Sequence, residues 1–375
     1  MKLSIWEKES FFKHRDIIIV GAGLSGLWSA YHLKKRNPSL SIAIVERGLI
    51  PTGASTRNAG FACFGSLTEL LHDQANMGDD KTLELVSMRY QGLQQIMQTF
   101  NPAEIGFTLS GGYELITDTQ SRDSLNEGLE KINNLLASVI PSKQTFVLAN
   151  EKIGRFGFQG VTQLIENSHE GYLHAGKLCQ LLLQIVQASG VTVLNGINVT
   201  GYTKINGSFN ILTEQQYELS ATRLLICTNA FAKDLISGID IIPARGQVLL
   251  TNPIPGLKWK GTFHAEEGFY YFRNLDSRVL LGGARNQDIK SENSEDMVTT
   301  PAIQQALEYF LQKYIIPGVP YTISDRWSGI MAMGNEKMPI IREIEEGLFC
   351  AVRMSGMGVA LTPVIGETIA LKMLG

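Results

Sequence analysis

A short glycine-rich run near the amino-terminal end constrains the fold more than any other feature of the chain. Residues 16–20 are mostly β-branched, and the four residues after Asp16 are uncharged. This composition is typical of a strand buried on both faces of a parallel sheet. The run that follows, Gly21-Ala-Gly23-Leu-Ser-Gly26, fits the pattern G-x-G-x-x-G and opens an amphipathic helix. The three glycines permit a tight turn, a close approach of the backbone to a pyrophosphate, and packing of the helix on the strand.

A second apolar strand, residues 41–45, closes on Glu46, and this acid completes the pattern. A carboxylate at this distance from the last glycine can accept the two ribose hydroxyls of an adenosine. A glycine-rich turn without a ligand is the alternative interpretation. Because strand, glycines, helix, strand and acid occur together in one unit, the sequence favours a dinucleotide-binding site.

Composition narrows the class of protein. The 375 residues are 44% hydrophobic and 18% charged with a net charge of −3, which is typical of a globular protein with room for two domains. A net negative charge gives no indication of the basic surface that binds nucleic acid. No apolar run approaches the roughly 18–20 residues that span a bilayer, and the amino-terminal residues lack the apolar core of a signal peptide. We therefore expect a cytoplasmic protein without a membrane span.

Cysteine and histidine usage excludes two kinds of site. The 4 cysteines are far apart and form no C-x-x-C pair, which argues against a dithiol–disulfide reductase and favours buried, reduced thiols. The 6 histidines show no metal-ligand spacing, so we expect no metal.

A second ligand-facing segment follows Glu46. Residues 47–66 are dense in small side chains and should be irregular, with backbone groups free to face a ligand. Ser55 or Thr56 can cap a short helix whose amides face phosphate, and Arg57 adds positive charge. The alternative, a mobile surface loop, predicts more Lys and Glu than the run contains.

The remaining chain alternates between two kinds of organisation. Residues 82–136 read as an inserted layer, and a helix followed by Gly190 and a strand at 191–194 rejoins the parallel sheet. The strand at 222–227 ends in small and polar residues, where ligands lie in open α/β sheets. A strand-rich region spans residues 246–284, and a glycine-rich turn at 355–358 precedes the last helix.

Taken in order, these stretches resemble the FAD-dependent oxidoreductases of the D-amino-acid oxidase, glycine oxidase and sarcosine oxidase superfamily. The resemblance covers nearly the whole chain. Its motifs are the amino-terminal fingerprint, G-A-S-x-R-N-A-G from Gly53, G-x-x-H from Gly171, the strand end at Cys227-Thr-Asn-Ala230, P-x-R-G-Q from Pro243, F-Y-Y-F-R from Phe269, W-x-G from Trp327 and S-G-x-G-V from Ser355.

The resemblance implies an α/β fold, α+β overall, with two domains. A Rossmann-like FAD-binding domain would comprise residues 1–85, 150–232 and 325–375. A substrate domain built on a mixed or antiparallel sheet would comprise residues 86–149 and 233–324.

The resemblance also places FAD on matching positions. Residues 355–359 would lie beneath the flavin pyrimidine, and the other positions would contact the pyrophosphate, the adenosine, the ribityl chain or the flavin. The predicted cofactor residues are Gly21, Gly23, Leu24, Ser25, Gly26, Glu46, Arg47, Ala54, Ser55, Arg57, Asn58, Ala59, Val199, Thr228, Asn229, Gly329, Ser355, Gly356, Met357, Gly358 and Val359. The family often has Gly where this chain has Asn229. A helix start beneath the pyrimidine would stabilise the negative charge of reduced flavin.

The predicted catalytic residues are Tyr270, Tyr271, Arg273 and Met331. Because alternate strand residues face opposite sides, one of the two tyrosines should face the ligand. Other apolar candidates for the pocket, most of which would lie in the core, are Phe61, Phe64, Trp327, Met333 and Met357.

Several positions depart from the family pattern. Glycine oxidases carry arginines for the substrate carboxylate where this chain has Met331 and Gly356, and these segments look closer to gamma-glutamylputrescine oxidoreductases. Arg273 or Arg285 could still bind a carboxylate. Sarcosine oxidases carry an oxygen-activating lysine where Leu280 aligns, and no cysteine near residues 331–338 could bind flavin covalently.

We therefore expect a nucleotide-binding flavoprotein with non-covalent FAD that oxidises the C–N bond of a small amine or amino acid to an imine by hydride transfer to flavin N5. The sequence leaves open whether oxygen or another compound accepts the electrons from the reduced flavin. One alternative is an FAD dehydrogenase with an acceptor other than oxygen. The other is a flavin-binding protein without turnover.

Overall fold

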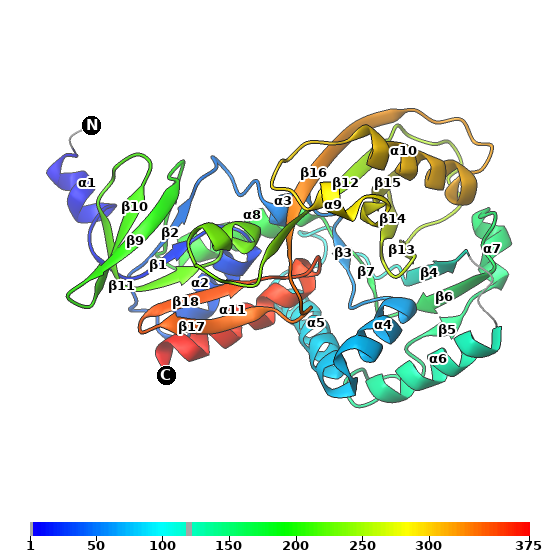
Figure 1. Ribbon diagram of the computed structural model, residues 1–375, viewed down its shortest axis with the longest axis horizontal. Coiled ribbons are helices and arrows are strands. Elements are labelled where there is room, and N and C mark those ends of the chain that lie inside the picture. Colours follow the sequence, from blue (N-terminus) through cyan, green and yellow to red (C-terminus); the bar gives the residue numbers. More distant parts are fainter. Residues whose placement is uncertain (1–2, 118–121) are drawn as a thin grey trace. The chain divides into compact units, whose positions relative to one another are not determined.

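A computed structural model of the protein describes residues 3–117 and 122–375 and divides into two compact units (Figure 1). Unit 1 comprises Met1–Thr56, Ala175–Ala244 and Met331–Gly375, and unit 2 comprises Arg57–His174 and Arg245–Ile330. Of the predicted domains, residues 1–2 and 118–121 lie outside the described residues.

Unit 1 is built on a sheet whose central path runs β17-β18-β11-β1-β2-β8. The strands are β1 (Arg15–Val20), β2 (Ile42–Glu46), β8 (Thr192–Asn195), β11 (Leu219–Ile226), β17 (Ile340–Glu345) and β18 (Leu348–Val352), with the hairpin β9 (Val199–Ile205) and β10 (Ser208–Thr213). β1 pairs in parallel with β2 and β11, and β18 pairs in parallel with β11. Ile17, Ile18 and Ile19 of β1 are fully buried, as an apolar strand covered on both faces requires.

Unit 1 also contains helices. They are α1 (Ile5–Ser10), α2 (Leu24–Arg36), α3 (Ala54–Arg57), α8 (Ala175–Ala188) and α11 (Gly358–Leu374), with the 3₁₀ helix η1 (Asn229–Asp234). α2 packs against both α8 and α11. A Cβ at Gly366 would lie 2.6 Å from the backbone carbon of Trp28, so only glycine allows α11 to come this close to α2.

Unit 2 is built on a sheet of order β16-β12-β15-β14-β13-β4-β6-β5. The strands are β4 (Gly112–Ile116), β5 (Val147–Leu148), β6 (Gln163–Asn167), β12 (Ile242–Thr251), β13 (Thr262–Ala265), β14 (Tyr270–Leu275), β15 (Arg278–Gly283) and β16 (Ile323–Met333), with the separate pair β3 (Phe61–Ala62) and β7 (Gly171–Tyr172). β4 and β13 pair in parallel, whereas β13–β14, β14–β15 and β4–β6 are antiparallel. The prediction of a mixed sheet is confirmed.

Aromatic side chains form much of the core of unit 2. Phe263 and Phe272 stack with their ring centroids 4.7 Å apart, and Trp259 packs edge-on against both. Burial of one such ring stabilises the fold by roughly 1.5–3 kcal/mol. The helices of this unit are α4 (Leu67–Met77), α5 (Asp79–Thr99), α6 (Arg122–Leu136), α7 (Glu151–Phe156), α9 (Ile289–Glu292) and α10 (Pro301–Phe310), with the 3₁₀ turn η2 (Arg285–Gln287) and the π-helical turn η3 (Leu311–Ile315).

In the sequence, the boundaries between the two units fall at other residues than the predicted domain boundaries. Residues 57–85 and 150–174 belong to unit 2, and the divisions near residues 244 and 330 fall within β12 and β16. The reason is local packing: α4 packs against α5 and α6, and β6 pairs with β4. The predicted fold class, an α/β protein with a parallel sheet and a second mixed sheet, is confirmed.

Candidate functional site

The glycine-rich turn between β1 and α2 leaves no room for side chains. A Cβ at Gly26 would lie 2.0 Å from the carbonyl oxygen of Gly21, and Gly21 itself has a φ of +105°. A Cβ at Gly21 would also lie 2.9 Å from the carbonyl oxygen of Cys227, at the end of β11. The turn therefore brings the backbones of β1, β11 and α2 together, as the predicted nucleotide-binding unit requires.

The short helix α3 lies directly against this turn. The Ser55 hydroxyl accepts a hydrogen bond of 2.8 Å from the backbone N–H of Leu24, and a Cβ at Gly23 would lie 2.9 Å from the same oxygen. Two predicted cofactor segments that are distant in sequence are thus joined. The Ser25 hydroxyl instead donates to the carbonyl of Ala351 in β18, at 2.8 Å.

Glu46 ends β2 with its carboxylate turned toward the glycine-rich turn. One carboxylate oxygen accepts from the backbone N–H of Ala22 at 3.0 Å, and the other accepts from that of Gly48 at 2.9 Å. A carboxylate oxygen can accept a second hydrogen bond, so ribose hydroxyls remain compatible with this arrangement. The N–H of Ile197 donates to the carbonyl of Glu46, which brings the start of β9 with Val199 beside it.

Arg47, the next residue, stacks on an aromatic ring. Its guanidinium carbon lies 3.9 Å from the ring centroid of Phe231 in η1. Such a cation–π pair fixes the direction of a long side chain. Phe231 was not among the predicted residues.

The end of β11 explains one departure from the family pattern. Asn229 has a φ of +49°, a left-handed conformation that glycine and asparagine adopt more readily than other residues. Its side-chain oxygen accepts from the backbone N–H of Arg353 at 3.2 Å. The neighbouring Thr228 hydroxyl is buried and has no hydrogen-bond partner.

The predicted pyrimidine segment forms a turn between β18 and α11. Ser355 and Gly356 have φ values of +46° and +84°, and the buried Ser355 hydroxyl has no hydrogen-bond partner. A Cβ at Gly356 would lie 3.5 Å from the sulfur of Met331. The turn also contains Met357, and α11 starts with Gly358 and Val359.

These features of unit 1 fit FAD. Buried hydroxyls without a partner are uncommon in folded proteins, and both Thr228 and Ser355 carry one at this edge of the sheet. The carboxylate of Glu46 supplies acceptors, and the bare glycine backbone supplies a close surface. The residues present therefore suit a dinucleotide with hydroxyl and phosphate groups.

Four of the predicted cofactor residues lie in unit 2. The Arg57 guanidinium donates to the carbonyl of Ser328 at 3.0 Å, and the Trp327 indole donates to the carbonyl of Arg57 at 3.0 Å. A Cβ at Gly329 would lie 3.1 Å from the Cβ of Arg57. The side chain of Asn58 accepts from the N–H of Gly60 at 2.9 Å, and Ala59 is buried in a small apolar cluster.

The two tyrosines of β14 face opposite sides of their sheet. Tyr270 is 4% exposed and stacks on Phe310 of α10, with ring centroids 4.2 Å apart. Tyr271 packs on the other side against Phe61, where no side chain at Gly282 would fit beside its ring. Burial raises the pKa of both phenols to about 12, so neither ionises near neutral pH.

A histidine that the sequence analysis did not single out completes this aromatic surface. His264 of β13 is the register partner of Tyr271, and its ring lies edge-on to Phe61 with centroids 5.1 Å apart. Burial lowers the pKa of His264 to about 4, and its Nε2 has no hydrogen-bond partner. The ring is therefore neutral. Strand register alone could have revealed it, because β13 and β14 form a short hairpin.

One terminal nitrogen of Arg273 is engaged by two backbone carbonyls, whereas its buried Nε has no hydrogen-bond partner. One terminal nitrogen donates to Gly60 at 3.1 Å and to Leu173 at 2.9 Å, and the guanidinium stacks on Tyr172 at 4.4 Å. Burial lowers the pKa of Arg273 to about 10, which leaves it charged at neutral pH. Arg285 lies in η2, and burial lowers its pKa as well.

Three buried carboxylates and one arginine hold residues 64–69 in unit 2; we call this group the Arg89 cluster (Glu69, Arg89, Glu114 and Glu170). Glu114 accepts from the Ser66 hydroxyl and the Thr68 N–H, each at 3.0 Å. Glu170 accepts from the N–H of Phe64 at 2.8 Å.

Arg89, fully buried, donates to the Phe64 carbonyl at 3.0 Å and pairs with Glu69 at 3.3 Å, while its Nε and second terminal nitrogen have no partner. Burial raises the pKa of Glu114 to about 7 and that of Glu170 to about 8. The cluster thus combines a buried arginine, two of whose nitrogens lack hydrogen-bond partners, with two carboxyl groups that resist ionisation.

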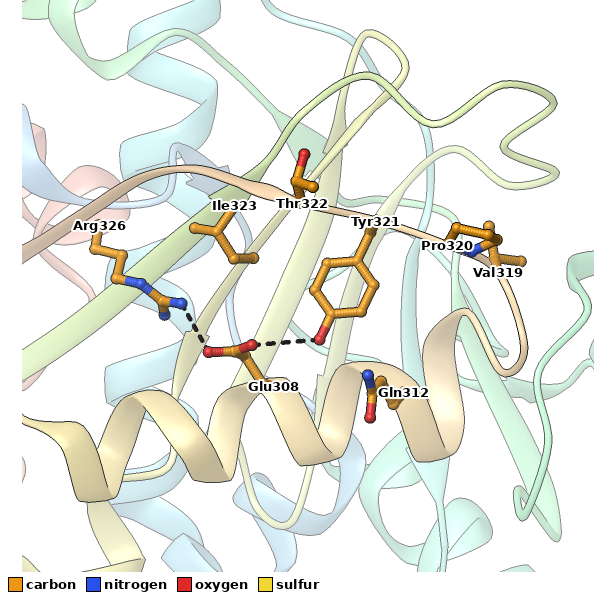
Figure 2. Close-up of a pocket in the computed structure, with 8 residues that line it drawn as sticks. All are labelled: Glu308, Gln312, Val319, Pro320, Tyr321, Thr322, Ile323 and Arg326. Carbon is orange, nitrogen blue, oxygen red and sulfur yellow. Dashed lines mark hydrogen bonds and ion pairs between the residues drawn. The ribbon is translucent and has the colours of Figure 1, made fainter.

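A surface groove of about 560 Å³ lies elsewhere in unit 2 (Figure 2). Figure 2 shows Glu308 of α10 between Arg326 and Tyr321, with an ion pair of 2.7 Å to the arginine. None of the predicted cofactor or catalytic residues lines the groove.

Three further findings concern the described residues as a whole. Within residues 3–117 and 122–375, no helix is long and apolar enough to cross a membrane. In the same residues, no three His, Cys, Asp or Glu side chains gather in a way that could hold a metal ion. The cysteines Cys63, Cys179, Cys227 and Cys350 are free and buried.

Comparison with known proteins agrees with this geometry. The chain is 23% identical over 388 residues to a probable oxidoreductase OrdL of Haemophilus influenzae, covering 97% of this chain and 84% of the relative. It is 22% identical to gamma-glutamylputrescine oxidoreductase of Escherichia coli, covering 96% and 84% of the two chains. Among solved structures, L-proline dehydrogenase from P. horikoshii has the same fold, with a TM-score of 0.75, 18% identity and coverage of 96% and 93%.

The family profile described as "DAO: FAD dependent oxidoreductase" matches residues 16–371, nearly the whole chain. The match includes the glycine-rich turn, Glu46 and the turn before α11. The chain therefore belongs to the FAD-dependent oxidoreductases of this family and is an enzyme.

Proposed function

We propose that the enzyme oxidises the C–N bond of a small amine to an imine, which water then hydrolyses. The glycine-rich turn, Glu46 and the turn before α11 would hold FAD, which would supply a hydride acceptor, the flavin N5, for this oxidation. The protein's part is to orient a neutral amine and to exclude water, and a strong side-chain base is not obligatory for this.

The observation that carries the preference for amines is the contact between Met331 and Gly356. A Cβ at Gly356 would lie 3.5 Å from the Met331 sulfur, so the two positions that carry arginines in glycine oxidases are neighbours here and both are uncharged. A carboxylate buried without a cation is strongly penalised. We infer a substrate whose carboxylate, where it has one, lies at a distance from the reacting carbon.

The state of Arg273 supports the same proposal. Its terminal nitrogen already serves the carbonyls of Gly60 and Leu173. A guanidinium used in this way has fewer donors left for a substrate carboxylate.

Tyr271, Phe61 and neutral His264 supply the substrate surface in this proposal. All three side chains are uncharged near neutral pH, and two of the three ring pairs lie edge to face. Such a surface suits the apolar part of an amine and keeps water away from it. Tyr270 would act only by supporting the strand from the core side.

The electron acceptor is the second open question, and Leu280 favours one other than oxygen. Leu280 is 5% exposed and packs with Ala59, Val248 and Leu250, so it offers no charge where sarcosine oxidases carry their lysine. We propose that oxygen consumption is slow compared with reduction of an artificial acceptor such as a quinone. Oxygen use at the full rate of flavin reduction would contradict this.

A panel of paired compounds tests the substrate class. Each amine is mixed anaerobically with the yellow enzyme, and the α-amino acid with the same side chain is tested beside it. Gamma-glutamylputrescine is included because one relative is named as its oxidoreductase. Amines should bleach the flavin and their α-carboxylated partners should not. The variant Met331→Arg should shift the preference toward the α-carboxylated partner. Bleaching by glycine or D-alanine that is lost in Arg273→Met would overturn the proposal.

We also propose that FAD is held without a covalent bond. The thiols of all four cysteines are buried, and burial raises the pKa of Cys179 and Cys227 to about 12, which disfavours the thiolate. Acid precipitation should therefore release the yellow colour into the supernatant, and colour in the pellet would refute this.

A further inference from the structure

The turn that precedes α11 contains two non-glycine residues in the left-handed conformation. Arg353 has a φ of +63° and Ser355 a φ of +46°, and Gly356 follows at +84°. Such conformations are unfavourable for residues with a side chain and persist only where surrounding contacts hold them. A backbone hydrogen bond of 3.2 Å from the Ser355 N–H to the Ala332 carbonyl holds one side of this turn, and the side-chain contacts of Arg353 hold the other.

Arg353 is almost fully buried and joins three separate segments of unit 1. Its Nε donates to the carbonyl of Met338 at 2.9 Å, and a terminal nitrogen donates to the carbonyl of Asp240 at 3.3 Å and pairs with the Asp240 carboxylate. Its backbone N–H donates to the side chain of Asn229 at 3.2 Å. One residue thus ties the turn to the end of β11 and to the segments around residues 240 and 338.

The partners of Arg353 are themselves fixed. The Asp240 carboxylate accepts from the backbone N–H of Asn335 at 3.0 Å and from its side-chain amide at 3.0 Å. A Cβ at Gly334 would lie 2.8 Å from the Cδ of Arg353 and 2.8 Å from an Asp240 oxygen. A side chain at residue 334 would therefore displace the Arg353 guanidinium or the Asp240 carboxylate.

The turn held in this way carries the unsatisfied Ser355 hydroxyl and leads into the amino-terminal end of α11. We propose that Arg353, through Asp240, is a positioning residue that holds residues 355–358 in the conformation that binds the flavin pyrimidine. The inference rests on the proposed cofactor site. Its consequence is that Arg353 sets both the affinity for FAD and the stabilisation of the reduced flavin, although it needs no contact with FAD.

Four variants test the proposal through the Kd for FAD and the two-electron reduction potential. Arg353→Met should weaken FAD binding about tenfold and shift the potential negative by about 30 mV, the equivalent of a tenfold weaker preference for reduced flavin. Arg353→Lys replaces the planar guanidinium with a single ammonium group, so it should restore only part of the FAD affinity and of the reduction potential. Asp240→Asn should act in the same direction, and the double variant Arg353→Met/Asp240→Asn should be no worse than Arg353→Met alone.

Arg342→Met, which removes an exposed arginine from the neighbouring strand β17, is the matched control and should change neither quantity. If Arg353→Met does not fold, Gly334→Ala displaces the guanidinium without removing its charge and should give the same two shifts. Wild-type affinity and potential in Arg353→Met or Gly334→Ala would overturn the proposal, as would equal shifts in Arg342→Met.

A parallel measurement on Glu46→Gln separates the two levels of inference. If Glu46→Gln weakens FAD binding and the Arg353 variants do not, only the role of Arg353 fails. If Glu46→Gln also leaves FAD binding unchanged, the proposed cofactor site itself is wrong.

Discussion

Unit 1 and unit 2 hold their loops by different means. In unit 1, the turn after β1 depends on bare glycine backbone and on one carboxylate, Glu46, that accepts backbone N–H groups. In unit 2, residues 64–69 are held by the Arg89 cluster, whose ionisable side chains are buried and come from distant segments. The first arrangement resists substitution because of space, and the second resists it because its buried polar groups depend on one another for hydrogen bonds.

The largest effect should follow from removing the cation of the second arrangement. Arg89→Met removes a buried ion pair with Glu69 and the donor to the Phe64 carbonyl, which should cost about 3–5 kcal/mol of unfolding free energy. Urea denaturation measures the loss. Arg155→Met, at an exposed position of α7, is the control and should change stability little. A similar value for both variants would remove the distinction between the units.

A somewhat smaller loss is expected at Arg273. Arg273→Met leaves the buried carbonyls of Gly60 and Leu173 unsatisfied, at a total of about 2–4 kcal/mol. Denaturation followed by the intrinsic fluorescence of unit 2, which contains Trp259 and Trp327, would detect it. Arg285→Met should have a stability closer to that of the wild type, because within residues 3–117 and 122–375 the Arg285 side chain makes no hydrogen bond. If Arg273→Met is fully stable, its nitrogens are available for a substrate and the proposed preference for amines weakens.

In unit 1 the corresponding substitution should affect the ligand more than the fold. Glu46→Ala removes a carboxylate that accepts from Ala22 and Gly48, and FAD binding should weaken by about 1.5–3 kcal/mol. Titration of the apoprotein with FAD gives the Kd, and circular dichroism reports whether the apoprotein stays folded. An unchanged Kd would remove Glu46 from the site.

A last effect concerns pH and distinguishes the units most sharply. Burial raises the pKa of Glu114 to about 7 and of Glu170 to about 8, above their values in the unfolded chain, so the folded state binds more protons than the unfolded state between about pH 4.5 and 8. This contribution is complete below pH 4.5 and is lost as the pH rises through 7 and 8, by at most about 1.4 kcal/mol per pH unit for each proton.

The measurement is the difference in unfolding free energy between wild type and Glu170→Gln across this range. Glu69 and Arg89 face Glu170 as well, so the double variant Glu69→Gln/Glu170→Gln shows whether the slope belongs to Glu170. The wild type should lose stability relative to Glu170→Gln as the pH rises from 5 to 8. A difference that stays constant with pH would show that Glu170 ionises normally.

The same contrast explains what could be predicted from the sequence. The glycines of the first turn, Glu46 and the strands around them are local, so their spacing along the chain carries the geometry. Alternation along β14 correctly separates Tyr270 from Tyr271, because strand residues face opposite sides. Asn229 could be recognised as a departure, but the reason for it, a left-handed backbone, is visible only in the structure.

Long-range contacts account for what was not predicted. Arg89, Glu114 and Glu170 lie on different elements, and nothing in the residues near each of them reveals the others. Arg353 and Asp240 are 113 positions apart in the chain. The assignment of residues 57–85 depends on contacts of α4 with α5 and α6, so the chain sequence alone gave no sign that they join unit 2.

The discontinuity of unit 1 has a consequence for synthesis on the ribosome. Strand β11 finds its neighbour β18, and helix α2 finds its cover α11, only in the segment Met331–Gly375. From the time β11 has been made until residues 331–375 follow, the edge of β11 therefore lacks its partner strand, and Trp28, which is fully buried in the finished protein, lacks its cover of α11. The nucleotide-binding unit is thus completed only when residues 331–375 have been made, although its most recognisable residues, Gly21 to Glu46, are made before the whole of unit 2.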